Sequence, residues 1–242
     1  MTRIRADLLL VARGLAESRA KARAAIEAGG VFADGALVVK PSDLIAENAA
    51  LDVTPEHPWV SRGGVKLAHA LDAFGLDPAG RACLDVGAST GGFTQVLLTR
   101  GAAHVYAVDV GSGQLHANLR GDARVSNLER TDARMLTASF FREAPSLIVC
   151  DASFIGAAKV LATPLALAAQ RADLVVLIKP QFEAGPKAAK QGILSEEVAR
   201  AAAQEAIASL DGLSGFAFKR AVDSPIRGGD GNLERLAWFV RG

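Results

Sequence analysis

The chain has 242 residues, half of them hydrophobic, and a formal net charge of +1. This length suffices for one large domain, or for a domain of ordinary size with a smaller one. No apolar run reaches the roughly 18 residues that a membrane-spanning helix needs, and no charged-then-apolar leader opens the sequence. We therefore expect a cytoplasmic protein without stable membrane association.

Cysteine and histidine give no sign of a redox or metal site. Cys83 and Cys150 both lie in apolar, strand-like runs, so we expect them to be reduced residues of the core. The histidines, at positions 57, 69, 104 and 116, lack the spacing of metal ligands. We expect no bound metal.

The small net charge conceals an uneven distribution. Residues 1–23 carry six basic and two acidic side chains, whereas residues 24–60 carry one basic and six acidic ones. The first segment therefore has a balance of +4 and the second a balance of −5. Such asymmetry can direct one face toward a polyanion while the total stays near neutral.

The amino-terminal segment is predicted to begin with two helices. Residues 6–13 have a helical composition and are followed by Gly14, a typical helix terminator. Ser18 can cap a second helix that ends at Gly29-Gly30. In that helix Arg19 and Arg23 share one face.

A hairpin and a linker follow these helices. Asp34-Gly35 is a strong turn signal between the apolar residues 31–33 and 36–39. A further short strand, which would close a small sheet, is predicted near residues 51–53. Two prolines in the following residues forbid helix and limit sheet, which predicts a linker at about residues 54–60.

From residue 59 onward, strand-like and helix-like segments alternate. Strands are predicted at 82–86, 104–108, 125–128, 147–150 and 174–178, with a final pair at 216–222 and 235–240, and helices at 92–100, 155–170 and 196–210. Such alternation predicts an α/β fold, in which helices cover both faces of a mainly parallel sheet. Residues 181–192 are polar and basic and are predicted to form a mobile loop.

A glycine-rich turn follows the first predicted strand. The sequence LDVGASTGGFT begins at Leu84, and Asp109 ends the next strand 22 residues after Gly87. This layout is typical of a nucleotide-binding αβ unit, in which the second acid accepts hydrogen bonds from a ribose diol. The spacing Gly-x-x-x-Gly-Gly differs from that of dinucleotide enzymes, which favours S-adenosylmethionine over a pyrophosphate.

Polar side chains also follow other predicted strands. Asp85 closes the first strand, Asp151 follows the fourth, and Lys179 follows the fifth, an apolar run in which a lysine is unusual. Ligands of open parallel sheets bind at the carboxyl ends of the strands. Each residue alone could be a charge that reaches water, but Asp151 and Lys179 on adjacent strand ends favour a functional site.

Short motifs spread along the chain resemble one enzyme family. They are residues 5–7 (RAD), 13–19 (RGLAESR), 61–67 (SRGGVKL), 84–94, 106–111 (YAVDVG), 129–131 (ERT), 179–185 (KPQFEAG) and 224–226 (SPI). By these motifs the chain resembles, over essentially its whole length, the TlyA family of RNA 2′-O-methyltransferases, often labelled hemolysins. Two departures are minor: Ala6 replaces the usual Leu, and Asp34 stands where Asn is commoner, adding negative charge to a region expected to face RNA.

The resemblance implies the domain organisation. Residues 59–242 would form an FtsJ-like domain with the Rossmann-like class I fold of S-adenosylmethionine-dependent methyltransferases, built on a mostly parallel seven-stranded sheet. Residues 1–58 would form a small α+β RNA-binding domain of the alpha-L type, which a small-subunit ribosomal protein shares with pseudouridine synthases. The Lys-Asp-Lys-Glu catalytic tetrad of the family maps onto Lys66, Asp151, Lys179 and Glu234.

The resemblance also implies the ligands. S-adenosylmethionine would be the cofactor, and ribosomal RNA, free or in a ribosomal subunit, the partner, with a cytidine ribose as the target; we expect a monomer. The residues expected at the cofactor are Asp85, Gly87, Ala88, Ser89, Thr90, Gly91, Gly92, Phe93, Asp109, Asp132 and Asp151. The residues expected at RNA are Arg3, Arg5, Arg19, Lys21, Arg23, Arg62, Lys187 and Lys190.

The implied reaction is an in-line displacement in which a ribose 2′-oxygen takes a methyl group. Lys179 is our candidate general base; if it keeps its proton, it would instead orient the hydroxyl and stabilise the developing oxyanion. The amino-terminal segment holds few aromatic residues, so recognition of folded RNA by its shape and backbone is expected rather than base stacking.

Three other interpretations differ in class. A membrane-active cytolysin is suggested by the hemolysin label, but no amphipathic or spanning segment supports it. A nicotinamide-dependent oxidoreductase is disfavoured by the spacing of the glycine turn. An RNA-binding assembly factor with degenerate catalysis is disfavoured by the four tetrad residues, all of which are present.

Overall fold

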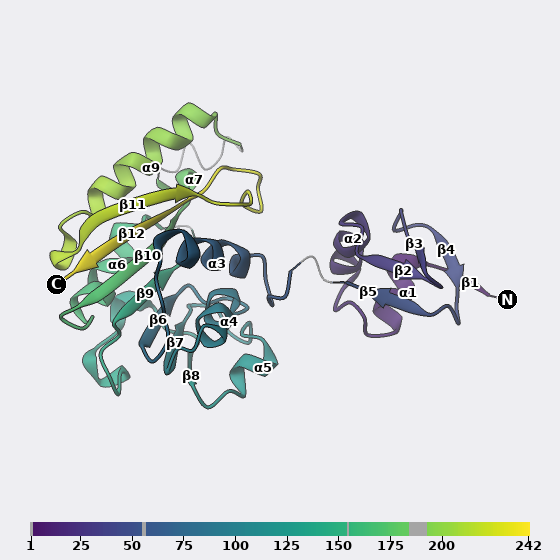
Figure 1. The fold of residues 1–242 in the computed structure, drawn as a ribbon, viewed down its shortest axis with the longest axis horizontal. Coiled ribbons are helices and arrows are strands. Elements are labelled where there is room, and N and C mark those ends of the chain that lie inside the picture. The colour runs from purple at the N-terminus through teal and green to yellow at the C-terminus, as the bar shows by residue number, and fades with distance from the viewer. Residues whose placement is uncertain (1, 55–56, 154, 184–192) are drawn as a thin grey trace. The chain divides into compact units, whose positions relative to one another are not determined.

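The computed structural model describes residues 2–54, 57–153, 155–183 and 193–242. The chain divides into two compact units, Met1–Pro58 and Trp59–Gly242, each of which has its own elements (Figure 1). Among the described residues, no helix is long and apolar enough to cross a membrane.

The first unit packs two helices against two small sheets. Its strands β1 and β4 pair with each other, and β3, β2 and β5 form a three-stranded sheet. Leu10 and Ile26, one from each helix, lie with Val31 in a common core. The elements are β1 (Arg3–Arg5), α1 (Ala6–Ala12), α2 (Arg19–Glu27), β2 (Val31–Ala33), β3 (Ala36–Leu37), β4 (Leu44–Ala46) and β5 (Leu51–Val53).

Side chains at the predicted cap and turn act as the sequence indicates. The Ser18 hydroxyl accepts the Lys21 N–H at 3.3 Å and caps α2. Asp34 has a φ of 50°, and its carboxylate accepts the Ala50 N–H at 2.8 Å. Its charge therefore stabilises the turn before β5. The β1–β4 pair was not predicted, because three-residue strands are too short for a periodic signal.

The second unit is built on a seven-stranded sheet with the order β11-β12-β10-β9-β6-β7-β8. Five neighbouring strands, β10, β9, β6, β7 and β8, run parallel. Strand β12 is antiparallel to both of its neighbours, β10 and β11. The strands are β6 (Ala82–Val86), β7 (His104–Val108), β8 (Val125–Leu128), β9 (Leu147–Cys150), β10 (Ala172–Ile178), β11 (Ala217–Asp223) and β12 (Arg235–Arg241). The predicted α/β class and all seven predicted strands are confirmed.

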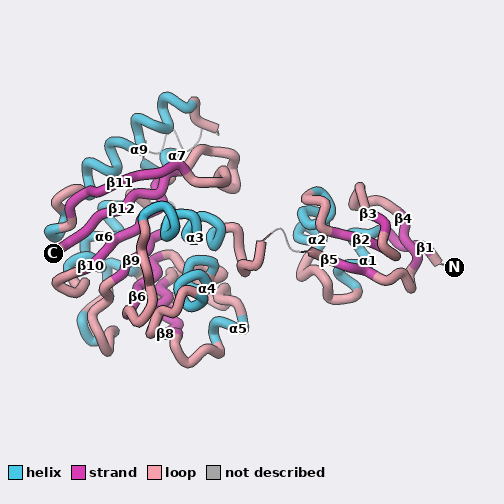
Figure 2. The backbone as a smooth tube through the Cα atoms, in the orientation of Figure 1, coloured by secondary structure: helices cyan, strands magenta, loops and turns pink. Residues whose placement is uncertain are grey.

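Helices cover both faces of this sheet (Figure 2). Alternate strand residues point to opposite faces, so Leu84 packs in one core with α6 and α9, while Cys83 packs in the other with α3 and α4. Both cysteines are free and buried, as predicted. The helices are α3 (Gly63–Phe74), α4 (Gly92–Thr99), α5 (Ala117–Arg120), α6 (Ala157–Ala166), α7 (Pro180–Glu183) and α9 (Glu196–Leu210), with short 3₁₀ turns at 133–135, 138–140 and 213–215.

Helix α3 is not among the predicted helices, although its apolar pattern is visible in the sequence. Its buried residues include Leu67, Ala70, Leu71 and Phe74, the spacing of an apolar helical face, and Gly75 ends it with a φ of 69°. Its first turn begins with two glycines. A Cβ on Gly64 would lie 2.4 Å from the Trp59 ring, so the glycine allows the residues after the linker to pack on the helix.

The predicted loop over residues 181–192 is wrong at its start, because α7 occupies Pro180–Glu183. Burial and one hydrogen bond hold this helix in place. Gln181 is buried, and the Glu183 carboxylate accepts the Ala157 N–H at the start of α6 at 2.9 Å. Residues 184–192 lie outside the described part of the chain.

Strand β6 contains a fully buried acid. The Asp85 side chain has no exposed surface, and it accepts a hydrogen bond from the Thr94 hydroxyl at 2.7 Å. Its other oxygen has no hydrogen-bond partner among the described residues. Burial raises the pKa of Asp85 from 3.8 to about 7, since desolvation disfavours the charged carboxylate.

This raised pKa predicts a specific pH dependence of stability. Between about pH 4 and pH 7 the folded chain keeps the Asp85 proton that the unfolded chain releases, so the free energy of unfolding falls as the pH rises. Asp85→Asn removes this titration. We expect wild type to lose stability relative to the variant across this window, with a relative slope approaching about 1.4 kcal/mol per pH unit.

The measurement is denaturation of the full chain at several pH values. Both tryptophans, Trp59 and Trp238, lie in the second unit and report its unfolding by fluorescence. If the free energy of unfolding changed with pH equally in wild type and variant, Asp85 would already be ionised in the folded protein.

Candidate active site

Two adjoining hollows lie at the carboxyl ends of β6, β7 and β9. The larger has a volume of about 490 Å³ and the smaller about 210 Å³. Gly87, Ser89, Asp151 and Ser153 line both. Strand β6 lies between β7 and β9 in the sheet, and a crevice at this change of strand order is where open α/β sheets bind ligands.

The glycine turn brings backbone, rather than side chains, to the shared wall of the hollows. Gly87 has a φ of 84°, and a Cβ there would lie 3.0 Å from the Asp151 carbonyl oxygen and 3.1 Å from Ala152. Gly91 precedes α4 with a φ of 94°. Side chains at these positions would be strained, so glycine is what allows the chain to turn close to the site.

Asp109 presents a fixed carboxylate to the larger hollow. One of its oxygens accepts the Ser89 N–H at 2.8 Å, and the other accepts the Gly111 N–H at 2.7 Å. Each oxygen keeps capacity for a further donor. The same hollow has apolar walls that include Val108 and Ile155, so it combines a fixed carboxylate with apolar surface.

Asp132 also lines the larger hollow, but it is paired. Its carboxylate accepts hydrogen bonds from the Arg134 guanidinium at 2.5 to 3.1 Å and from the Arg134 N–H at 2.9 Å. These bonds lower the pKa of Asp132 from 3.8 to about 2. A ligand donor would share this carboxylate with Arg134.

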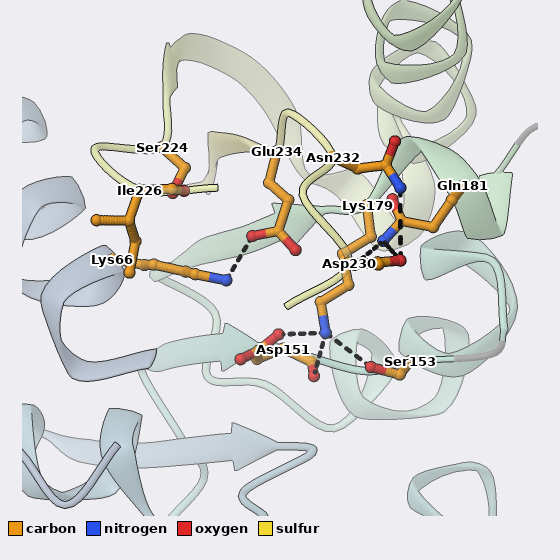
Figure 3. A network of polar contacts seen from close by, with 10 residues as sticks. All are labelled: Lys66, Asp151, Ser153, Lys179, Gln181, Ser224, Ile226, Asp230, Asn232 and Glu234. Carbon is orange, nitrogen blue, oxygen red and sulfur yellow. Dashed lines mark hydrogen bonds and ion pairs between the residues drawn. The ribbon is translucent and has the colours of Figure 1, made fainter. Parts of the chain in front are cut away.

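The Lys179 amine lies at the end of the smaller hollow. It is 2.6 Å from one Asp151 carboxylate oxygen and donates a hydrogen bond to the Ser153 hydroxyl at 2.7 Å. Figure 3 shows the side chain extended toward both residues. Strands β10 and β9 pair in parallel, which explains why residues 28 positions apart meet at one edge.

A second ion pair forms between Lys66 on α3 and Glu234, just before β12 (Figure 3). Both are buried, with 7% and 3% of their surface exposed. Burial raises the pKa of Glu234, while the charges of Lys66 and Lys179 act in the opposite direction. The charges of Lys179 and Asp151 also act on the pKa of Glu234, so the two ion pairs lie near each other (Figure 3).

The remaining residues expected at the cofactor occupy two kinds of place. Ala88, Thr90, Gly92 and Phe93 line the smaller hollow. Asp85 lines neither hollow and lies beneath the turn. Residues that the sequence analysis did not single out are Ser153, Gln114, Thr131 and Arg134, all of which line the larger hollow. Ser153 could have been found from the sequence, because it lies two residues after Asp151 at the end of a predicted strand.

Four basic residues of the first unit are held by acids. Arg5 and Arg19 both bind the buried Asp7 carboxylate at 3.0 Å, which holds the pKa of Asp7 well below its usual range. Arg23 binds Glu27 at 2.8 Å, and Lys21 binds Glu17. Arg5, Arg19 and Arg23 nevertheless line one hollow of about 370 Å³.

The other cations expected at RNA are less constrained. Arg3 and Arg62 are exposed, and a Cβ on Gly229 would lie 3.4 Å from the Arg62 guanidinium, next to the loop that leads to Glu234. Lys187 and Lys190 lie outside the described residues. Within the described residues, no group of His, Cys, Asp or Glu side chains is arranged to hold a metal ion.

Comparisons with known proteins agree with this architecture. Residues 59–241 match the FtsJ-like methyltransferase family and residues 4–51 match the S4 domain. The chain is 47% identical over 240 residues to the 16S/23S rRNA (cytidine-2′-O)-methyltransferase TlyA of Mycobacterium tuberculosis, covering 98% of this chain and 90% of that protein. It is 39% identical to Hemolysin A of Brachyspira hyodysenteriae, covering 98% of this chain and all of that protein.

A solved structure supports the same assignment. A candidate hemolysin from Streptococcus thermophilus superposes with a TM-score of 0.77 at 38% identity, over the whole of this chain and 89% of that one. The glycine turn, the acid after β7 and the two ion pairs thus occur in a chain whose larger part matches one enzyme family. The protein belongs to the FtsJ-like methyltransferase family and carries an amino-terminal S4 domain.

Proposed function

We propose that this methyltransferase transfers a methyl group from S-adenosylmethionine to the 2′-oxygen of a cytidine ribose in ribosomal RNA. The observation that supports this most is the meeting of two lysines and two acids beside the glycine turn. The relatives named rRNA (cytidine-2′-O)-methyltransferases support the choice of substrate. We also propose that the protein acts in the cytoplasm, on ribosomal RNA that is free or part of a ribosomal subunit.

The larger hollow fits the nucleoside part of the cofactor. Asp109 would accept the ribose hydroxyls, Val108 and Ile155 would contact the adenine, and Asp132 would reach its amine while remaining bound to Arg134. The backbone around Gly87 would approach the methionine part. S-adenosylmethionine supplies a methyl group on a sulfonium, which is already a good leaving group.

The residues of the chain would then align the hydroxyl and manage its proton. Lys179 would contact the attacking 2′-hydroxyl, either accepting its proton or stabilising the developing oxyanion. Asp151 and Ser153 hold the amine at one place. Lys66 and Glu234, which line neither hollow, would complete the tetrad as a second, buried ion pair. Alignment of this kind can contribute several kcal/mol to lowering a barrier.

The S4 domain would provide the RNA contacts outside the active site. Arg5, Arg19 and Arg23 line one hollow, and their guanidinium groups suit phosphate oxygens. Arg62, on the catalytic unit, would make an RNA contact of its own. The pairing with Asp7 reduces the net charge of the hollow but holds two guanidiniums in fixed orientations.

The alternatives are weaker. The match of the larger unit to a methyltransferase family contradicts a nicotinamide-dependent oxidoreductase. The tetrad positions are filled and paired, which disfavours degenerate catalysis. Hemolysin names among the relatives do not explain why four polar side chains converge beside the glycine turn.

Lys179→Ala tests the catalytic proposal. We expect methylation of ribosomal RNA to fall by at least about 100-fold, as for loss of a proton-transfer group, while the affinity for S-adenosylmethionine changes little. The assay is transfer of radiolabelled methyl groups, with calorimetry for cofactor binding. Lys159→Ala is the matched control, since Lys159 is exposed on α6. Full activity of Lys179→Ala would refute the assigned role.

Asp109→Ala tests the cofactor site. We expect the affinity for S-adenosylmethionine to fall by more than about tenfold, because the variant loses charged hydrogen bonds to the ribose. Asp122→Ala is the control: Asp122 likewise accepts the N–H two residues ahead, at 2.8 Å, but lies outside both hollows. Calorimetry reports the affinity. Equal affinities for the two variants would argue against this placement.

Replacing Arg19 and Arg23 by alanine tests the RNA contact. We expect weaker binding to a ribosomal RNA fragment and a salt dependence whose slope is smaller by about two, because two phosphate contacts are lost. Arg100→Ala serves as the control, since Arg100 forms a comparable surface ion pair with Asp72 at 2.8 Å. An unchanged salt slope in the double variant would place the RNA elsewhere.

A further inference from the structure

A cluster of three polar residues lies beside the tetrad and has no assigned role. Gln181 and Asn232 are almost completely buried, with 3% and 1% of their surface exposed. Both amides donate to one Asp230 carboxylate oxygen, Gln181 at 3.2 Å and Asn232 at 3.4 Å (Figure 3). Buried amides are costly unless they are hydrogen-bonded, so their presence here requires a reason.

The cluster joins the segments that hold two members of the tetrad. Gln181 lies two residues after Lys179, and Asn232 lies two residues before Glu234. The Asn232 side-chain oxygen also accepts the Leu194 N–H at 2.8 Å, just before the cap of α9. Three stretches of chain, distant in sequence, are therefore connected through side-chain hydrogen bonds.

The loop from Ser224 to Glu234 is wrapped closely around the Glu234 carboxylate. A Cβ on Gly228 would lie 2.6 Å from a Glu234 carboxylate oxygen, so the backbone there lies against the acid. The Gly228 N–H is bound by the Asn232 carbonyl at 3.0 Å, and the Ser224 N–H by the Glu234 carbonyl at 2.9 Å. A displacement of this loop would therefore move Glu234.

We propose that Gln181, Asp230 and Asn232 are positioning residues that set the distance between Lys179 and Glu234, and so align the two ion pairs for methyl transfer. The inference rests on the proposed function for its kinetic consequence. The cluster acts through the loop. Asp230 accepts hydrogen bonds from the side-chain amides of Gln181 and Asn232, and thus holds together the segments that carry Lys179 and Glu234. None of the three residues needs to contact the substrate.

Gln181→Glu is the sharpest test. It places a carboxylate against the Asp230 carboxylate where a hydrogen bond was, and like charges at this distance repel. We expect kcat to fall at least tenfold, while the affinity for S-adenosylmethionine and the KM for RNA change by less than about threefold, because a misaligned site loses rate rather than binding.

The double variant Gln181→Glu with Asp230→Asn restores an amide–carboxylate pair with the two roles exchanged. We expect it to recover kcat to within about threefold of wild type. If the cluster were merely structural, Gln181→Glu would change the melting temperature without lowering kcat selectively over KM. The double variant would then show no recovery of kcat. Rescue that restores melting temperature but leaves kcat low would overturn the inference.

Asp173→Asn is the matched control. Asp173 lies near the opposite end of β10 and binds Arg81 and the Trp238 ring N–H, both at 2.8 Å. Losing this carboxylate should lower the melting temperature with kcat unchanged at a permissive temperature. A fall in kcat equal to that of Gln181→Glu would mean that any destabilisation of β10 has this effect, and would overturn the assignment.

Hydrogen exchange separates this inference from the proposed function. In Gln181→Glu we expect the amides of Leu194 and Gly228 to lose protection, and in the double variant to regain it. Unchanged protection in Gln181→Glu would overturn the positioning role whatever the activity. If wild type fails to methylate ribosomal RNA, the proposed function falls, and the exchange data still decide whether the cluster holds the loop.

Discussion

The ion pair between Lys66 and Glu234 is the constraint on which the site depends. It joins residues 168 positions apart, and its formation requires that α3 packs on one face of the sheet while β12 pairs with β10. Both charges are buried, so each is costly without the other; removing one partner of a buried pair typically costs about 3 to 5 kcal/mol. The pair therefore links the catalytic geometry to correct docking of the last strand.

A parallel sheet explains the other half of the site. Its strands end at one edge, where Asp151 and Lys179 meet and where the glycine turn brings the backbone close. Asp85 lies below this turn with a raised pKa, and Asp109 is fixed by two backbone N–H groups above it. Asp109 therefore lies at the hollow proposed for a positively charged cofactor, whereas Asp85 lines neither hollow.

The amino-terminal unit handles its charges differently. Four of its basic residues are paired with acids of the same unit, and the buried Asp7 orients two guanidiniums at once. An arginine that is already held loses less side-chain entropy on binding a phosphate than a free one. Asp34, whose charge suggested a conflict with RNA, instead accepts a backbone N–H within the fold.

Much of the fold is local in origin and was predictable. Most strands of the large sheet are short apolar runs, Ser18 and Gly14 mark helix ends, and Asp34-Gly35 marks the hairpin; these signals depend on neighbours in the chain. Helix α3 was overlooked because Gly63 and Gly64 hide its start, and Gly64 leaves room for Trp59, a residue from before the helix, to pack against it.

The sequence by itself determined the α/β class, the glycine turn and the acid after β7, because strand periodicity and turn chemistry are properties of adjacent residues. Asp151 and Lys179 could be singled out by their places at adjacent strand ends, whereas Lys66 and Glu234 could be named only by resemblance. Their pairing, Lys66 with Glu234 and Lys179 with Asp151, and the cluster of Gln181, Asp230 and Asn232 were decided by the tertiary structure. Which charge meets which depends on strand order and loop path, and these arise from long-range packing that no local pattern encodes.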